Sequence, residues 1–449
     1  MQDKDYTGAV ADFRAVLKDQ PDSVEVLTLL AAAHQANGEK ELALDALNRA
    51  VEAKPGNVDA RLRLAQYLAN TGALAASLEQ INTILKTDPA SVPGLRAKAE
   101  ILARQGHSAE LEEVLTKLEK ASPETGLGAF GKGRLYKSQK KYPEAVAAFE
   151  EALSKEPDSI LALSELITTQ IAMGDTDAAI TRLQALLEKD PAHKAAHDLL
   201  GLVYMARKEY PLAEAEFSKQ LKVNPDSSVV YTQLAEARLK QGNAAGAEQA
   251  LKDGLARLAN DERLTLALAS LYSQQGKLDQ AAETLRQAMT SSPDNPRFVL
   301  GYGQVLERQG HYDEAISTYE QFLEKTPDNV LATNNLAALL ADHKQDEQSL
   351  KKAKALADKL ADAKQPALLD TLGWVDYRLG NYGDAIKVLS GVVAQAPDVP
   401  VFNYHLGMAY LKQGNKQEAR KYLAKAVGEK YTYFGIDDAR KALAELGKK

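Results

Sequence analysis

Ten positions in this 449-residue chain stand 34 residues apart, and nine of them are occupied by proline. The prolines are Pro21, Pro55, Pro89, Pro123, Pro157, Pro191, Pro225, Pro293 and Pro327, while Ala259 holds the tenth position. Loops of globular enzymes vary in length, so a period this strict indicates identical supersecondary units stacked in a row. The sequence therefore predicts a solenoid.

Glycine marks a second position of the same period. It occurs at Gly38, Gly72, Gly106, Gly174, Gly242, Gly276, Gly310, Gly380 and Gly414, and lysine replaces it at Lys140, Lys208 and Lys344. Glycine suits the end of a helix, because the residue that follows a helix often needs a positive φ. Small residues recur seven residues before this glycine, as at Ala31 and Gly133, and five residues after it, as at Ala43 and Ala145. Two small positions on successive helices predict a closely packed helix pair.

The composition is 45% hydrophobic but only 6% aromatic, which favours helices over strands. Each unit thus reads as a first helix, a tight turn, a second helix beginning at residues such as Tyr142, and a proline turn. These positions resemble the tetratricopeptide repeat, and HYDEAISTYEQFLEKTP (311–327) and NYGDAIKVLSGVVAQAP (381–397) are similar to its second half. The resemblance implies an all-α fold, a right-handed α-solenoid of about twelve 34-residue helix-turn-helix units.

The array has irregular ends and one irregular turn. Residues 1–23 match a second helix without its first, residues 24–433 contain the twelve units, and 434–449 read as an amphipathic capping helix. Residues 341–353 form a longer turn, because Pro327 and Pro397 are two residues further apart than two units require. The missing first helix predicts a truncated unit and a natural protein that continues upstream, where any export signal or lipid anchor would lie.

Composition argues against several classes of function. The net charge is −7 and no basic run stands out, so a nucleic acid is not the expected partner. The absence of cysteine excludes thiolate chemistry, and no apolar run reaches the length of a membrane helix. His193 and His197 have the spacing of two metal ligands but no third ligand nearby, and no catalytic grouping is visible. We expect no metal, no cofactor and no enzymatic activity.

The stretch GLGAFGKG (126–133) contains the glycine spacing of a dinucleotide-binding loop. Such a loop follows a β-strand, whereas the preceding residues LEEVLTKLEKASPET read as a second helix and a proline turn. Gly133 occupies the small position of the repeat, so we interpret this stretch as the first helix of the fourth unit. Gly128, Gly131 and Gly133 each cost a helix about 1 kcal/mol relative to alanine, so this helix is expected to be the weakest.

The tetratricopeptide resemblance implies that the first helices line a groove that binds partners, and two regions of this groove carry distinctive side chains. The first is basic, with Arg96, Arg104, Phe130, Arg134 and Lys137. The second is aromatic, with Asp370, Trp374, Tyr377, Arg378 and Tyr404. Aromatic residues beside arginine are typical of protein interfaces and also stack on sugar rings. The alternative is that Trp374 and Tyr404 only fill space between neighbouring first helices.

Two narrower resemblances bear on the partner. Adaptors that clamp a chaperone's C-terminal carboxylate carry paired lysines and asparagines; Asn334 and Asn335 are the nearest candidates here, without the lysines, so this function is disfavoured. Residues 332–360, 368–386 and 402–427, including Leu372-Gly373-Trp374, look like the end of bacterial tetratricopeptide lipoproteins associated with exopolysaccharide production and exosortase.

Three hypotheses follow from these resemblances. The first is a periplasmic scaffold, anchored at the outer membrane by a lipid upstream, whose groove binds a protein segment in an envelope or exopolysaccharide-secretion assembly. The second is direct polysaccharide binding by the aromatic groove near Trp374. The third is a cytoplasmic adaptor with no link to the envelope.

Overall fold

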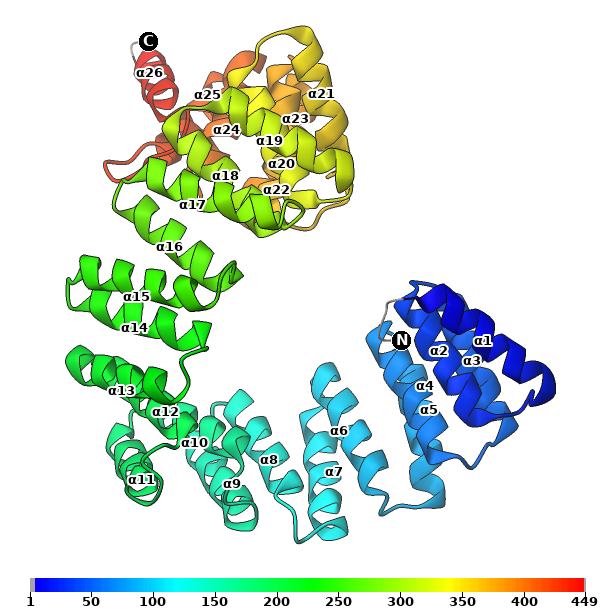
Figure 1. Cartoon of the computed structure of the whole chain (residues 1–449). Helices are drawn as coiled ribbons and strands as arrows, with labels where there is room; N and C mark the ends of the chain where they lie inside the picture. The colour runs from blue at the N-terminus through cyan, green and yellow to red at the C-terminus, as the bar shows by residue number, and fades with distance from the viewer. Residues whose placement is uncertain (1–4, 448–449) are drawn as a thin grey trace. The chain divides into compact units, whose positions relative to one another are not determined.

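Residues 5–447, which the computed structural model describes, form 26 α-helices and no β-strand (Figure 1). Helices α2 to α25 alternate as the first and second members of twelve helix pairs, which confirms the predicted all-α repeat array. The chain divides into two compact units, Met1–Val223 and Asn224–Lys449. Each unit contains six of the pairs.

In the first unit, α1 precedes the six pairs. Its helices are α1 (Tyr6–Asp19), α2 (Val24–Ala36), α3 (Lys40–Ala53), α4 (Val58–Asn70), α5 (Leu74–Thr87), α6 (Val92–Gln105), α7 (Ser108–Ala121), α8 (Leu127–Ser138), α9 (Tyr142–Lys155), α10 (Ile160–Met173), α11 (Thr176–Lys189), α12 (Lys194–Ala206) and α13 (Tyr210–Val223).

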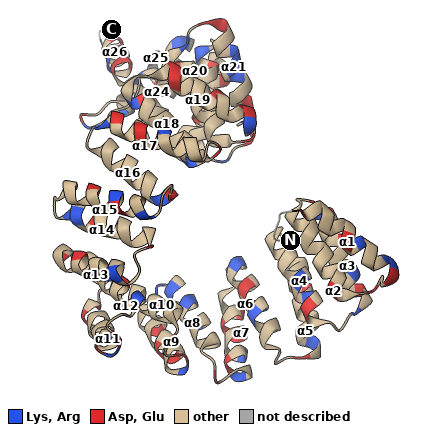
Figure 2. Cartoon of the chain, in the orientation of Figure 1, with Lys and Arg blue, Asp and Glu red and all other residues tan. Residues whose placement is uncertain are grey.

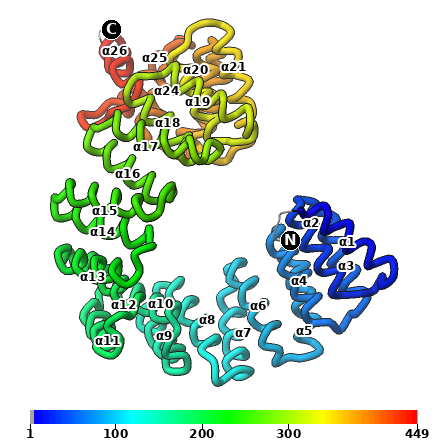
Figure 3. The backbone as a smooth tube through the Cα atoms, in the orientation of Figure 1, coloured from blue at the N-terminus to red at the C-terminus, as the bar shows by residue number. Residues whose placement is uncertain are grey.

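In the second unit, α26 follows the six pairs. Its helices are α14 (Ser228–Lys240), α15 (Ala244–Arg257), α16 (Glu262–Gln274), α17 (Leu278–Ser291), α18 (Pro296–Gln309), α19 (Tyr312–Lys325), α20 (Val330–His343), α21 (Glu347–Asp358), α22 (Pro366–Arg378), α23 (Tyr382–Gln395), α24 (Pro400–Gln413), α25 (Lys416–Ala426) and α26 (Ile436–Gly447). The tube in Figure 3 follows the alternation of helix and turn through each unit. Helix α26 begins two residues after the expected boundary at 434 and packs against α24 and α25.

The proline-marked turn begins each first helix with a recurring set of hydrogen bonds. In nine pairs a side chain before the helix accepts a backbone N–H of its first turn; these are Ser23, Asn57, Ser91, Ser159, His193, Ser227, Asp261, Asn295 and Asn329. Such a cap satisfies an N–H that has no partner within the helix. Six residues after the proline, Arg61, His197 and Asn403 each donate to its carbonyl, at 2.7, 3.0 and 2.8 Å.

The turn inside each pair needs a left-handed residue. All nine glycines predicted at this position have a positive φ, and Lys140 and Lys208 adopt the same conformation with φ of 59° and 62°. Lys344 does not, because its φ is −115° and α20 continues to His343 before an extended turn. Helix α21 then starts beyond Asp346, whose side chain caps it. Only residues 344–346 lie between α20 and α21, so the prediction of a longer turn at 341–353 is wrong; the longer connection, residues 359–365, follows α21.

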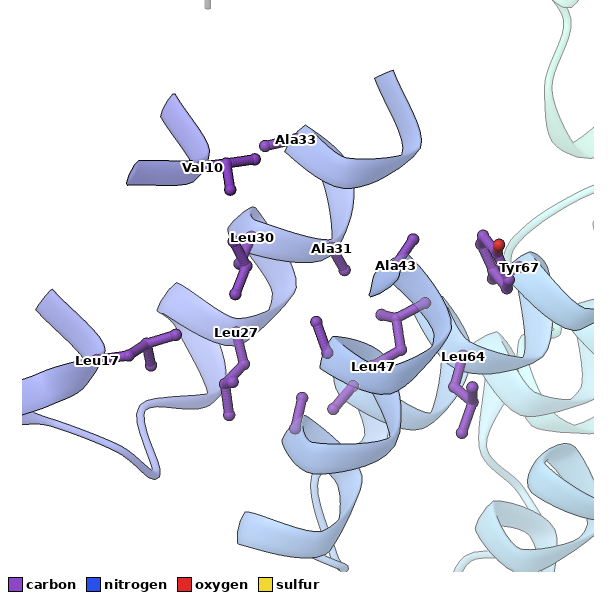
Figure 4. Packing of buried hydrophobic residues seen from close by; sticks show 13 residues of the cluster. Val10, Leu17, Leu27, Leu30, Ala31, Ala33, Ala43, Leu47, Leu64 and Tyr67 are labelled. Carbon is purple, nitrogen blue, oxygen red and sulfur yellow. The ribbon is translucent and has the colours of Figure 1, made fainter. Parts of the chain in front are cut away.

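One contact joins the two helices of most pairs: the small residue on the first helix meets a large side chain sixteen residues later on the second. The exceptions are Ile167, which is itself large, and Ala337, whose counterpart is Ala353. A Cβ added to Gly133 would lie 2.5 Å from the ring of Phe149, and Gly373 and Gly407 meet Leu389 and Leu423 in the same way. Gly201 meets Phe217 and Gly303 meets Tyr319. Where the small residue is alanine, the partner is smaller than these rings; Figure 4 shows the cluster that contains Ala31 and Leu47.

Helix α8 differs from the other first helices. Thr125, at the capping position, donates its hydroxyl to Ser122, and the N–H of Gly126 donates to Glu156, so α8 begins only at Leu127. The interpretation of GLGAFGKG as a helix is confirmed. A Cβ on Gly128 would lie 2.9 Å from the backbone nitrogen of Glu119 and 2.9 Å from the carbonyl oxygen of Leu115. The glycines that lower helix propensity thus let α8 approach α7 and α9 closely.

We expect Gly133→Ala to destabilise the fold by about 1–3 kcal/mol, because the added methyl overlaps the Phe149 ring. The double variant Gly133→Ala, Phe149→Leu should recover much of this loss, since it recreates the alanine–leucine pairing of Ala31 and Leu47. Urea unfolding followed by circular dichroism measures both. As a control, Gly391→Ala on the open face of α23 meets no atom within 4 Å and should stabilise by about 1 kcal/mol. If the losses in unfolding free energy from Gly133→Ala and Phe149→Leu simply add in the double variant, this account of the pair is contradicted.

Candidate functional site

The first helices of the first unit line an open groove of about 1080 Å³. Its floor is apolar and includes Ile101, Leu111, Leu127 and the half-buried ring of Phe130. Arg96, Arg104 and Arg134 also line it, and with Phe130 and the apolar floor they form what we call the basic groove. The structure therefore brings together four of the five residues predicted for the basic region, while Lys137 lies outside the lining.

The basic groove is widest where α6 and α8 face each other. These two make the weakest contact among successive first helices of the first unit. Two features of α8 accompany this separation: its late start at Leu127 and the absence of a side chain at Gly131, which lies against Leu115. Phe130 is half-buried in the groove, and Leu161 of α10, which also lines it, is 62% exposed.

The positive charges of this region differ in their partners. Arg104 pairs with Glu100 at 2.6 Å, and Lys137 pairs with Glu165 at 2.7 Å and donates to Thr168. Arg96 and Arg134 are exposed, and neither forms an ion pair with any residue in the described range 5–447. An exposed guanidinium without a partner can bind a carboxylate in a bidentate manner. The groove thus offers apolar contact area flanked by two available cations.

In the second unit, the predicted aromatic residues gather around Trp374. We call Trp374, Tyr377, Tyr404, His405 and Tyr433 the aromatic cluster. The Trp374 ring stacks on His405 at 4.0 Å and on Tyr377 at 4.5 Å, and Tyr404 is tilted against it at 5.4 Å. Trp374 is only 4% exposed and Tyr404 only 3%. Both rings are interior side chains in this structure, as the space-filling alternative proposed.

Buried carboxylates surround this cluster. The indole Nε1 of Trp374 donates to Asp342 at 2.6 Å, and the Nδ1 of His405 lies 2.9 Å from Oδ2 of Asp370. The other oxygen of Asp370 is buried without a hydrogen-bond partner. Arg378 reaches only the backbone carbonyl of Asp342, at 3.5 Å. Trp374 and Arg378 thus both bond to Asp342, the indole to its carboxylate and the guanidinium to its backbone carbonyl.

The remaining predicted residue, Asn334, belongs to a separate hydrogen-bond chain. It donates to Asn335, which donates to the hydroxyl of Tyr319 at 3.2 Å, and that hydroxyl lies 3.3 Å from Glu307. Sequence reasoning missed Asp342, His405 and Tyr433. Asp342 lies near the end of α20 at the repeat position of Arg104, so the period could have identified it. Tyr433 lies beyond α25, where no period applies.

The two histidines with the spacing of metal ligands form structural hydrogen bonds instead. His193 accepts the N–H of Ala196 as a helix cap, and His197 binds Glu216 and the carbonyl of Pro191. Within residues 5–447 no group of three or more metal-ligating side chains gathers, and none of the helices found there is long and apolar enough to cross a bilayer. Lys and Arg are interspersed with Asp and Glu along the helices of both units (Figure 2).

Family models described as Tetratricopeptide repeat match almost the whole chain. One matches residues 1–58, 30–92, 96–160, 266–330, 303–364 and 371–432, and a second matches 137–203 and 204–271. Tetratricopeptide repeat protein 21B of Xenopus laevis is 28% identical over 131 residues, covering 29% of this chain and 10% of that protein. Hsp70-Hsp90 organizing protein 3 of Arabidopsis thaliana is 27% identical over 94 residues, covering 21% and 17%. The chain thus matches only a small part of either relative.

Two solved structures are similar in fold. Yeast Tom70 has a TM-score of 0.41 and 15% identity, and the likeness covers 96% of each chain. The Naa15/Naa10 structure with bound HypK-THB has a TM-score of 0.33 and 18% identity, covering 87% of this chain and 68% of that one.

Burial raises the pKa of Asp342, against the opposing effects of the Trp374 hydrogen bond and the nearby positive charges. A carboxyl with a raised folded-state pKa stabilises the fold when protonated. Its contribution is complete below the unfolded pKa of about 4 and is lost as pH rises through the folded pKa. Burial raises the pKa of Glu307 as well, so this carboxyl also makes the fold less stable as the pH rises.

We therefore expect Asp342→Asn, which keeps an acceptor for Trp374 but cannot ionise, to be more stable than the parent chain at pH 7. The gain should be about 1.4 kcal/mol for each unit of pKa shift and should shrink towards pH 4. Urea unfolding at pH 4.5 and 7, followed by Trp374 fluorescence, measures it. Asp362→Asn, at an exposed site, is the control for the lost charge. A variant less stable than the parent at pH 7 would refute the prediction.

Proposed function

The chain belongs to the tetratricopeptide repeat family, and we propose that it is a non-catalytic scaffold that binds a protein segment in the basic groove. The observation that carries this proposal is the combination of an apolar floor with two exposed, unpaired arginines in one open groove of the first unit. Protein interfaces concentrate their binding energy in such aromatic and arginine side chains.

The partner that fits is a peptide segment in which acidic residues alternate with apolar ones. Apolar side chains of this segment would cover Phe130 and Leu161, while its carboxylates pair with Arg96 and Arg134. The whole chain carries a net charge of −7, so a cationic groove is a local exception that orients an acidic ligand towards it. One relative is named for organising two other proteins, Hsp70 and Hsp90, which agrees with a scaffold role.

We also propose that this scaffold works in the bacterial envelope, in an assembly that makes or secretes exopolysaccharide, with a periplasmic location. The support is the resemblance of residues 332–360, 368–386 and 402–427 to lipoproteins of that kind. Fractionation of the full-length protein in its own host tests this location. Recovery in the envelope fraction supports the proposal, and recovery in the cytoplasm favours the alternative of a cytoplasmic adaptor.

Direct glycan binding near Trp374 has less support. Sugar rings stack on exposed aromatic faces, and Trp374 is 4% exposed. The ring would need to be uncovered before it could meet a saccharide. We therefore place the main binding site in the basic groove.

The basic groove is tested by charge reversal. A random 16-residue peptide library displayed on phage is selected against the full-length chain, and the recovered peptides are measured by fluorescence anisotropy. We expect peptides rich in Asp and Glu next to Leu, Ile or Phe, whose affinity falls about tenfold or more for the Arg96→Glu, Arg134→Glu variant. Raising the salt concentration should weaken the parent complex.

The matched control is Lys117→Glu, Lys120→Glu, which makes the same charge change on exposed positions of α7 outside the groove lining. It should leave peptide affinity within about twofold of the parent, allowing for long-range screening. Equal losses in both double variants would show that net charge alone selects the peptides, and the basic groove would not be the binding site.

A further inference from the structure

The segment between α25 and α26, residues 427–435, contains no helix and lies against the aromatic cluster; we call it the strap. The ring of Tyr433 packs on Tyr404 at 5.6 Å, and the ring of Phe434 packs on His343 of α20 at 4.7 Å. His343 is stacked in turn on Tyr312 at 3.5 Å. The strap thus extends across first helices that lie more than one repeat apart in the sequence.

At Gly435 the backbone of the strap lies in close contact with the Tyr404 ring. Gly435 has a φ of +91°, and a Cβ added there would lie 2.5 Å from the ring of Tyr404. Tyr404 is 3% exposed beneath it, while Phe434 at the outer side is 55% exposed. The strap therefore covers Tyr404, while Phe434 itself stays in contact with solvent.

Side chains, rather than backbone, carry this attachment. The backbone bonds made by the strap within the described residues are local turns, such as Tyr431 N–H to Gly428 O at 3.3 Å. The hydroxyl of Tyr433 donates to Ala426, at the end of the preceding helix. Each ring contact of this kind adds only modestly to the stabilisation from area burial. A segment held by a few such contacts can leave its surface at moderate cost.

The surface under the strap corresponds, by repeat position, to the open basic groove of the first unit. Eight repeat periods and the two-residue insertion separate Phe130 from Tyr404, and seven periods with that insertion separate Arg134 from Trp374. Arg104 corresponds to Asp342 in the same way. The position that Phe130 occupies in the open groove of one unit is thus held in the other by Tyr404, which the chain's own strap covers.

We propose that the strap is a built-in ligand of the second unit, and that the surface beneath it binds an extended aromatic segment of a partner protein when the strap leaves. The strap sequence GEKYTYFG (428–435) defines the ligand chemistry: two adjacent aromatic residues followed by a glycine that passes over Tyr404. This site lies wholly in the second unit and does not depend on the basic groove.

The test uses Trp374, the single tryptophan of the chain, as a reporter. The probe is the synthetic peptide GEKYTYFG with an N-terminal fluorescein, added to the full-length Tyr433→Ala, Phe434→Ala variant. We expect the variant to keep its helicity, to show red-shifted and more easily quenched Trp374 emission, and to bind the peptide about tenfold more tightly than the parent chain. Bound peptide should return the emission towards that of the parent.

Two controls make the result specific. The peptide GEKYTAAG should not bind, and the variant Tyr431→Ala should behave like the parent, because the Tyr431 ring contacts its own strap at Gly428. A second variant, Gly435→Ala, forces the strap away from Tyr404 without removing a ring and should also admit the peptide. If Trp374 emission is unchanged in both strap variants, or if it shifts while neither variant binds the peptide, the proposal is wrong.

Discussion

The structure depends on one repeated contact, in which a glycine or alanine of a first helix meets a large side chain sixteen residues later. Gly133 with Phe149 and Ala31 with Leu47 are two solutions to the same problem, because a larger partner needs a smaller opposite residue. Packed interiors have little free volume, so each solution sets how closely the two helices approach. Because most pairs are fixed in the same way, the proline turns can recur with a constant period.

One face of each first helix takes no part in this contact. The repeat position of Phe130 is filled by Arg96 one unit earlier, and by Asn334, Asp370 and Tyr404 in later units. A position that changes from cation to amide, carboxylate and aromatic ring cannot be part of the common core. Variation within one chain therefore identifies the functional face, although it does not say which occupant of that face is accessible.

The fold was predictable because its determinants are local and periodic. Proline turns, left-handed glycines and small helix positions are each visible within one 34-residue unit, and the structure contains the helices they predict. The site was only partly predictable. Trp374 and Tyr404 were identified, but Tyr404 is covered by Tyr433 and Gly435, which lie beyond α25, the last helix of the repeat array, and follow no period. The bond from Trp374 to Asp342 likewise joins residues 32 positions apart across an irregular turn.

The basic groove is open and the aromatic cluster is covered because the side chains of the two surfaces differ in chemistry. In the basic groove, the solvated guanidinium groups of Arg96 and Arg134 keep an apolar floor compatible with water, so the groove can stay open. Around Trp374 the neighbouring carboxylates are the buried Asp370 and the half-buried Asp342, and each is already bonded to a ring nitrogen of the cluster, so they do not serve this purpose. A stacked aromatic surface left bare would be an exposed apolar patch that invites association. A covering segment keeps this surface from solvent, and one held mainly by ring contacts is a cover that another aromatic segment can replace.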